Sequence, residues 1–185
     1  METPRIPGQG ERPRTAVVLG GYGTFGRLVS ASLAKHTEVR VLVAGRNEAS
    51  ATALCRTLGP NARPCMLDCA ASDFAQRLAA LAPTVVVDTV GPFQARNYSV
   101  ARACIEAGAH CLDLADGRDF VAGITTLHEA ARARGVLGHV VSAKRRHAQR
   151  VHYGAALIAV EVGEVLRRHA PPRGVEHQGE GSHVT

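Results

Sequence analysis

Short apolar runs alternate with segments of helical spacing along most of the chain, and this alternation is the strongest constraint on its fold. The apolar runs are rich in Val and Leu, as is typical of strands buried on both faces of a parallel sheet. We predict strands at residues 15–19, 38–44, 62–67, 84–88, 110–114 and 136–141. Helices are predicted between them, at residues 24–35, 48–58, 73–81, 98–107 and 119–134. The last helix carries its apolar residues on one face: Phe120, Ile124, Leu127 and Ala131. This alternation predicts an α/β fold, a doubly wound parallel six-stranded sheet with strand order 3-2-1-4-5-6.

The expected helix ends carry residues that favour such positions. Asn47, Ser72 and Asn97 precede three of the helices, where a side-chain oxygen can accept a hydrogen bond from a first-turn N–H. Gly108 and Gly135 follow two of them, as glycine commonly does where a helix ends. These residues support the helix bounds independently of the apolar pattern.

A glycine-rich turn joins the first predicted strand to the first predicted helix, with the sequence Gly20-Gly21-Tyr22-Gly23-Thr24-Phe25-Gly26. Gly21, Gly23 and Gly26 match the dinucleotide-binding pattern G-x-G-x-x-G in its required strand–turn–helix context. We expect Gly21 to permit the tight turn, Gly23 to admit the pyrophosphate and Gly26 to let helix and strand pack closely. Backbone N–H donors to the phosphates are expected from the residues between the glycines: Tyr22, Thr24 and Phe25. A glycine turn without a ligand is the alternative, which the flanking strand and helix disfavour.

The residues at the end of the second strand indicate which dinucleotide is bound. NAD-selective sites place an acid there, about 20 residues after the turn, to bind the ribose hydroxyls. Here the chain reads Ala44-Gly45-Arg46-Asn47, and the first acid after it is Glu48. The Arg46 guanidinium can bind a 2′-phosphate and stack on adenine. We therefore predict NADP as the cofactor, with NAD less favoured, and Arg46 and Asn47 beside it. A surface arginine without a ligand is the alternative.

Two more loops are expected at the same edge of the sheet. Asp68 and Cys69 follow the third strand and are candidate adenine contacts, although a simple strand-ending aspartate is an equal alternative. Four residues follow the fourth strand and are expected to face the ribose and nicotinamide half: Val90, Gly91, Pro92 and Phe93. Gly91 would allow close backbone approach, and a plain turn is the alternative.

No catalytic residue can be assigned from the sequence. None of the three tyrosines is followed by Lys four residues later, so the Tyr-x-x-x-Lys pair of short-chain dehydrogenases is missing. Asp113, Asp116 and His139 lie near predicted strand ends but are equally expected as plain end residues. The five cysteines lack zinc-like spacing, so no metal is predicted and reduced thiols of a cytoplasmic protein are expected.

Composition disfavours two classes of partner. Aromatic residues make up 4% of the chain and Trp is absent, which argues against base stacking on nucleic acid. The net charge of +6 includes one small basic cluster at residues 144–150. A solvated charged face explains this cluster better than a nucleic-acid-binding site does. No apolar run approaches the roughly 20 residues that span a bilayer. We expect neither a nucleic-acid nor a membrane partner.

The chain divides into three predicted parts. Residues 1–14 are a flexible leader rich in Pro and Arg, and residues 15–141 are the dinucleotide-binding domain. Residues 142–185 form a basic, His-rich tail, irregular except for a possible helix at 153–168. The composition changes abruptly at the tail, which we interpret as a truncated or frameshifted end.

The runs GGYGTFG, AGRN, DTVGPF and YSVARACIEAGAHCLDLADG, in this order and spacing, resemble the Rossmann-type NADP-binding domain of the saccharopine dehydrogenase-like proteins over residues 15–137. The resemblance implies cytoplasmic nicotinamide-dependent oxidoreductase chemistry, often in a homodimer, with these residues at the cofactor: Gly21, Gly23, Gly26, Arg46 and Gly91. Members continue into a large substrate domain, which the tail does not resemble. We therefore expect hydride transfer to or from a small metabolite of unknown identity if a substrate domain is supplied. The alternative is a non-catalytic NADP(H)-binding module or a truncated product.

Overall fold

The computed structural model describes residues 14–92, 97–115, 118–136 and 138–140, together with Val162 and Glu164. Phe93, Asp116 and nearly all of the predicted leader and tail lie outside the described residues, as does the side chain of His139. Predictions for those positions stay predictions.

Parallel strands form the centre of the fold, in the order β3-β2-β1-β4-β5. Their bounds are β1 Arg14–Leu19, β2 Val39–Gly45, β3 Ala62–Met66, β4 Val85–Asp88 and β5 His110–Asp113. The short β6, Gly138–Val140, pairs in parallel with β5 at one edge. The α/β class and the order of the first five strands are confirmed. Because the chain leaves β1 toward β2 and returns to its other side at β4, a switch point lies between β1 and β4.

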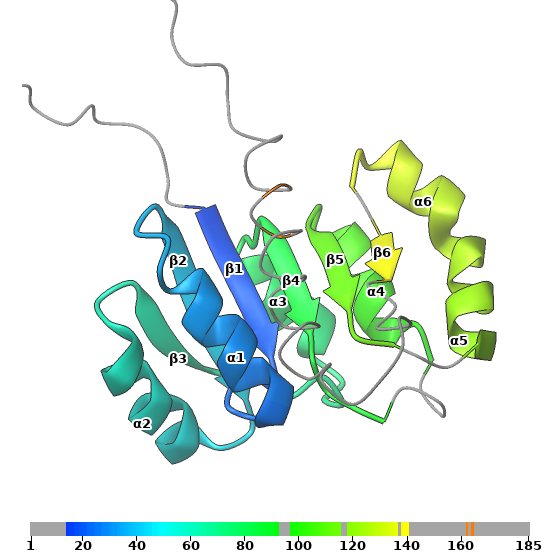
Figure 1. Ribbon diagram of the computed structural model, residues 1–185. Helices are drawn as coiled ribbons and strands as arrows, with labels where there is room; N and C mark the ends of the chain where they lie inside the picture. Colours follow the sequence, from blue (N-terminus) through cyan, green and yellow to red (C-terminus); the bar gives the residue numbers. More distant parts are fainter. Residues whose placement is uncertain are drawn as a thin grey trace, which may run out of the picture.

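Helices cover both faces of this sheet. On one face α1, Thr24–Leu33, and α2, Glu48–Leu58, pack through Val29, Leu33 and Ala51. On the other face lie α3, Phe74–Ala80, and α4, Ser99–Glu106. Figure 1 shows the first pair in front of the sheet and the second pair behind it.

Alternate side chains of β1 enter the two cores. Val18 joins the α1 face and Val17 joins the α3 face, and neither is exposed at all. Full burial of such a side chain contributes about 1.5–3 kcal/mol. The central strand is thus held rigidly from both faces, and its carboxyl end is a fixed platform for the turn that follows.

The predicted helix caps are right at one position and shifted at two. The Asn47 Oδ1 accepts a hydrogen bond from the Ser50 N–H at 2.9 Å and begins α2 as expected. The prediction for Ser72 is wrong: the residue before α3 is Asp73, because Phe74 N–H still bonds the Ala71 carbonyl in a preceding turn. The Asn97 Oδ1 accepts from Ser99 N–H at 3.0 Å, but Tyr98 is the residue that precedes α4.

The glycines expected after two helices have the backbone that this position needs. The φ angles of Gly108 and Gly135 are +68° and +65°, in the left-handed region that glycine adopts without steric cost. The predictions for these two helix ends are confirmed.

The helix predicted at residues 119–134 is not continuous. It consists of α5, Arg118–Gly123, the 3₁₀ turn η1, Ile124–Leu127, and α6, His128–Ala133. The Thr125 and Thr126 hydroxyls donate to the carbonyls of residues 122 and 123 within this stretch, a local bonding that competes with regular helix.

Val162 is the one residue of the predicted tail whose packing is described in detail. It is fully buried on the α1 face of the sheet, in the cluster that also contains Val85, Val87 and Leu112. These three come from β4 and β5, so this position of the tail contributes to the core of the domain.

Candidate dinucleotide-binding site

The glycine turn lies at the carboxyl end of β1 and is tied to its neighbours by backbone hydrogen bonds. Gly21 N–H donates to the Ala44 carbonyl at 3.1 Å, and Gly23 N–H donates to the Gly20 carbonyl at 2.8 Å. The Ser30 hydroxyl of α1 donates to the Gly21 carbonyl at 3.1 Å. The turn is therefore fixed between β2 and α1.

The first two glycines of the turn, Gly20 and Gly21, are required for different structural reasons. Gly20, not Gly21, has the positive φ angle, at +69°. A Cβ on Gly21 would lie 2.8 Å from the Val18 carbonyl oxygen and 3.0 Å from Val43 Cγ1. The turn-forming role predicted for Gly21 therefore belongs to Gly20, and Gly21 is required by close packing against the strands.

Gly26 and Gly23 differ in the space around them. A Cβ on Gly26 would overlap the Gly20 carbonyl oxygen, which supports the predicted helix–strand packing role. Among the described residues, a Cβ on Gly23 would meet only the Gly20 carbonyl oxygen, at 3.1 Å. Gly23 is the residue before α1, and neither a capping side chain nor a first-turn acid is found there. The first N–H groups of α1 thus face an open, exposed turn, as an anion site requires.

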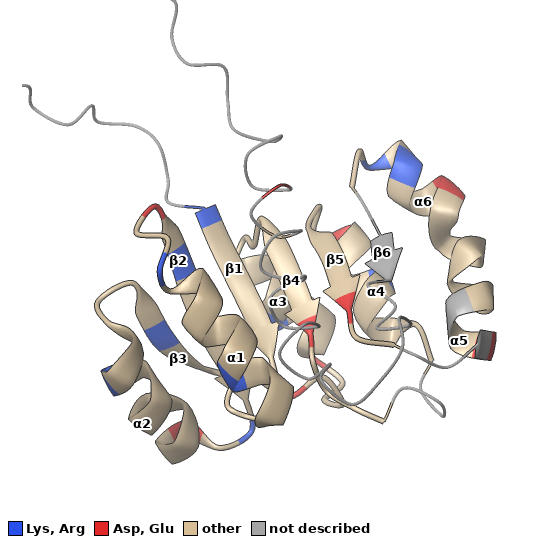
Figure 2. Cartoon of the chain, in the orientation of Figure 1, with Lys and Arg blue, Asp and Glu red and all other residues tan. Residues whose placement is uncertain are grey.

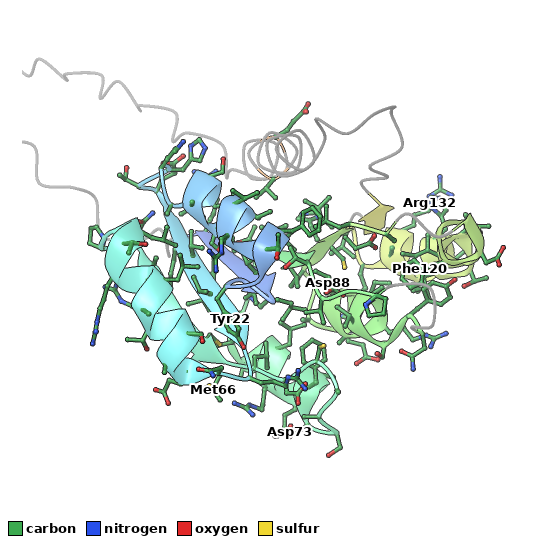
Figure 3. All side chains as sticks on the ribbon, turned by 60° about the horizontal axis from the view of Figure 1, so that its bottom comes forward. Tyr22, Met66, Asp73, Asp88, Phe120 and Arg132 are labelled. Carbon is green, nitrogen blue, oxygen red and sulfur yellow. The ribbon has the colours of Figure 1, made fainter. Side chains whose placement is uncertain are left out.

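Tyr22 extends from the turn to the end of β2, as Figure 3 shows at the carboxyl edge of the sheet. A Cβ on Gly45 would lie 2.5–2.7 Å from the Tyr22 ring and hydroxyl, so the ring lies directly over this glycine. The Tyr22 hydroxyl accepts a hydrogen bond from the Asn47 N–H at 2.9 Å. The sequence suggested only a backbone donor at Tyr22, because spacing along the chain does not show that residues 22 and 45 meet.

Arg46 and Asn47 follow β2 at this edge. Arg46 is exposed, and no acidic side chain of the described residues pairs with it. Asn47 uses its side-chain oxygen to cap α2. The guanidinium is therefore available to an anion, whereas the amide oxygen of Asn47 is already engaged.

A pocket of about 580 Å³ opens between the loop after β3 and the start of α4. Cys69, Ser72 and Asn97 are among the residues that line it. Asp68 is not a lining residue, and its Oδ1 accepts from the Ala70 N–H at 2.9 Å within its own loop. Of the two candidate adenine contacts, Cys69 therefore borders the pocket, whereas Asp68 shapes the loop.

The loop after β4 contacts the glycine turn directly. Thr89 donates to the Leu19 carbonyl through its N–H at 3.1 Å and through its hydroxyl at 2.6 Å. Val90 Cγ2 would lie 3.0 Å from a Cβ on Gly20. A Cβ on Gly91 would have no atom of the described residues within 4 Å, and the peptide bond between Gly91 and Pro92 is cis. The predicted residues Val90, Gly91 and Pro92 therefore lie at the same edge as the turn.

Two buried aspartates end the neighbouring strands β4 and β5. Asp88 and Asp113 are register partners on β4 and β5 and are 3% and 4% exposed. Figure 2 shows acidic residues at these two carboxyl ends. Each Oδ1 accepts a loop N–H at 2.9 Å, from Val90 and Ala115 respectively. Asp113 was among the sequence candidates; Asp88 was not, although an aspartate ending an adjacent strand was a visible signal.

A buried thiol lies beneath these carboxylates. A hydrogen bond with the Cys104 side chain, together with burial and the nearby Asp88 and Asp113, raises the pKa of Cys111 well above its ordinary value. Cys111 is therefore a neutral core thiol. No group of three or more His, Cys, Asp or Glu in the described part of the chain could hold a metal.

The sheet order, the glycine turn and the open start of α1 define a Rossmann-type dinucleotide-binding domain. The chain matches the family model of the saccharopine dehydrogenase NADP-binding domain over residues 16–154, and it belongs to that family. The match confirms the resemblance found in the sequence and identifies NADP as the cofactor. It extends beyond the 15–137 range of that resemblance. No curated protein matches the chain.

Solved structures share the fold at low sequence identity. A metagenomic short-chain oxidoreductase in complex with NADP is 19% identical, with a TM-score of 0.60 over 80% of this chain and 90% of the other. The Pseudomonas aeruginosa RhlG/NADP complex is 17% identical, with a TM-score of 0.58 over 81% and 79%. The 3-hydroxyacyl-CoA dehydrogenase type-2 from Mycobacterium avium is 13% identical, with a TM-score of 0.62 over 80% and 89%. At these identities the likeness concerns the fold alone.

No described helix is long and apolar enough to cross a membrane.

Proposed function

We propose that this chain is the NADP(H)-binding domain of a saccharopine dehydrogenase-like oxidoreductase that transfers hydride to or from a small metabolite. The observation that carries the proposal is the open turn at Gly23, beside the uncapped start of α1 and the exposed Arg46, with which no acidic side chain of the described residues pairs. Backbone N–H groups and a guanidinium at one edge suit a ligand with two separate phosphate groups.

The cofactor would extend across the carboxyl edge of the sheet. Its pyrophosphate would lie over Gly23 and the first turn of α1, and its 2′-phosphate at Arg46. The pocket that Cys69 borders is the place for adenine, and the open space at Gly91 is the place for the nicotinamide half. When bound, the cofactor supplies the hydride, and the described residues hold and orient it.

The full extent of the domain belongs to the same proposal. Pairing of β6 with β5 supports a six-stranded sheet, and burial of Val162 supports a tail that folds with the domain. A cytoplasmic location, a homodimer and an unidentified small-molecule substrate remain proposals that rest on the family.

Titration of NADPH into the Arg46→Ala variant tests the 2′-phosphate site. A hydrogen-bonded charge pair contributes about 1.5–3 kcal/mol, so the NADPH Kd should rise at least about tenfold while NADH binding stays the same. Arg40→Ala is the matched control, because Arg40 is an exposed arginine of β2 near the opposite edge of the sheet. Equal losses for NADPH and NADH, or equal losses for both variants, would refute the assignment.

A second candidate function is cofactor binding without catalysis by this chain alone. It is favoured by the engagement of Asp88 and Asp113 with their own loops, since both carboxylates already accept backbone hydrogen bonds. Steady-state oxidation of NADPH with candidate imines and enoyl thioesters separates the two functions. Turnover by the 185-residue chain would exclude the binding-only function.

A further inference from the structure

Tyr22 and Gly45 form a matched pair at the end of β2. The ring occupies the space into which any side chain at position 45 would extend, with ring and hydroxyl atoms 2.5–2.7 Å from the Cβ position. Gly45 is the last residue of β2 and precedes Arg46. This is the strand end where an acid would bind the ribose hydroxyls of NAD. An aspartate at position 45 cannot be accommodated unless Tyr22 moves away.

Three contacts hold Tyr22 in place. Its oxygen accepts the Asn47 N–H at 2.9 Å, while its ring packs against the core on the α1 face. The Tyr22 carbonyl accepts from an Arg27 guanidinium N–H at 3.4 Å, which ties the backbone of the turn to α1. The ring is thus held from both ends, and its hydroxyl is fixed beside the start of α2.

The hydroxyl retains a donor for a second partner. A phenol can donate one hydrogen bond while it accepts another. The oxygen accepts from Asn47, and none of the described residues takes its proton. Arg46 lies between Gly45 and Asn47 in the chain, so this donor and the guanidinium are offered at the same strand end. Hydrogen bonds to an ionised acceptor are roughly twice as strong as neutral ones, so such a donor favours a phosphate over a ribose hydroxyl.

We propose that Tyr22 is a specificity-determining residue for NADP(H) over NAD(H). Its ring fills the space that an acidic side chain at position 45 would need, and its hydroxyl donates to the 2′-phosphate. The inference rests on the proposed NADP(H) site and adds a neutral donor and an excluding ring to the charge of Arg46.

The Tyr22→Phe variant separates the hydroxyl from the ring. We expect its NADPH Kd to rise roughly tenfold, as for the loss of a hydrogen bond to a charged group, and its NADH Kd to stay within about twofold. The same contrast should appear between 2′,5′-ADP and 5′-AMP, which differ at the 2′-phosphate alone. Tyr98→Phe is the matched control: its hydroxyl donates to the Phe120 carbonyl at 3.0 Å, so its loss should change stability and leave the NADPH/NADH ratio unchanged.

A second pair of variants tests the ring. Gly45→Asp alone should weaken binding of both cofactors, because the new side chain displaces the ring. Tyr22→Ala combined with Gly45→Asp should reverse the preference toward NADH. Thermal unfolding of each variant without ligand shows whether it folds.

The outcomes distinguish the role of Tyr22 from the proposed function on which it rests. A wild-type chain that binds neither cofactor overturns both the proposed function and the role of Tyr22. If the wild-type chain prefers NADPH but Tyr22→Phe keeps the same ratio, the proposed function stands and the role of the hydroxyl is wrong. If Gly45→Asp alone shifts the preference toward NADH as far as the double variant does, the excluding role of the ring is wrong.

Discussion

Alanine at Gly26 should lower stability and alanine at Gly23 should lower NADPH affinity, although the two glycines are three residues apart in one motif. A Cβ on Gly26 would overlap the Gly20 carbonyl oxygen and lie 2.7 Å from Gly21 Cα. Both are backbone atoms, so no side chain can rotate to make room. In the described part of the chain a Cβ on Gly23 meets only the Gly20 carbonyl oxygen, at 3.1 Å, and the backbone there, at φ −69° and ψ 179°, suits alanine.

The expected magnitudes follow from these contacts. Overpacking costs about 1–3 kcal/mol, and two backbone overlaps place Gly26→Ala at the upper end. Alanine recovers about 1 kcal/mol in helix propensity, which leaves a loss of about 2 kcal/mol and a fall in Tm of roughly 4–8 °C for a chain of this size. For Gly23→Ala, the poorer helix start costs roughly 1 kcal/mol, while the lower entropy of the unfolded chain offsets about 0.4–1 kcal/mol. The stability of Gly23→Ala should therefore stay close to that of the wild-type chain.

Thermal unfolding without ligand and NADPH titration, applied to both variants, check this contrast. Gly23→Ala should unfold near the wild-type temperature and bind NADPH more than about tenfold more weakly, because its methyl group occupies the approach to the pyrophosphate. Gly26→Ala should instead unfold at a lower temperature than the wild-type chain. A Gly26→Ala chain as stable as the wild type, or a Gly23→Ala chain that binds NADPH normally, would refute the separation of roles.

Three further predictions concern the described core and loops. Val162→Asp should lower the free energy of unfolding by about 3 kcal/mol in chemical denaturation, because it buries an unpaired charge; an unchanged midpoint would show that the tail does not fold with the domain. Asn47→Ala should lower it by about 1 kcal/mol through loss of the α2 cap, and an unchanged free energy of unfolding would contradict the cap assignment. Burial raises the pKa of Cys65, so iodoacetamide should modify it more slowly than a free thiol near neutral pH, with the rate increasing toward alkaline pH. Bound NADPH should slow the reaction of iodoacetamide with Cys69, and peptide mapping that shows no protection of Cys69 would argue against adenine in the adjoining pocket.

The sequence predicted those parts of the fold that depend on local pattern. β1, β2 and β4 were found because β-branched residues buried on both faces form continuous apolar runs. The end of α4 was predicted correctly because Gly108 follows it, and glycine readily adopts the positive φ angle found there. The motif Gly21-x-Gly23-x-x-Gly26 located the turn, although the positive φ falls on Gly20.

The missed features depend on contacts between distant residues or on competing local bonds. The meeting of Tyr22 with Gly45 joins two loops and leaves no periodic signal. The break at η1 follows from threonine hydroxyls that bond neighbouring carbonyls, which apolar spacing does not report. Ser72 is an acceptable cap by residue type, but the turn before α3 moves the helix start to the next residue.

Calorimetric titration of NADPH and of NADH into the wild-type chain tests the central claim most directly. The open turn at Gly23 should admit either pyrophosphate, whereas Arg46 and the Tyr22 hydroxyl should add affinity for the 2′-phosphate alone. We therefore predict binding of both cofactors, with NADPH at least about tenfold tighter. Equal affinity for the two, or no binding of NADPH, would contradict the assignment of this edge of the sheet as an NADP(H) site.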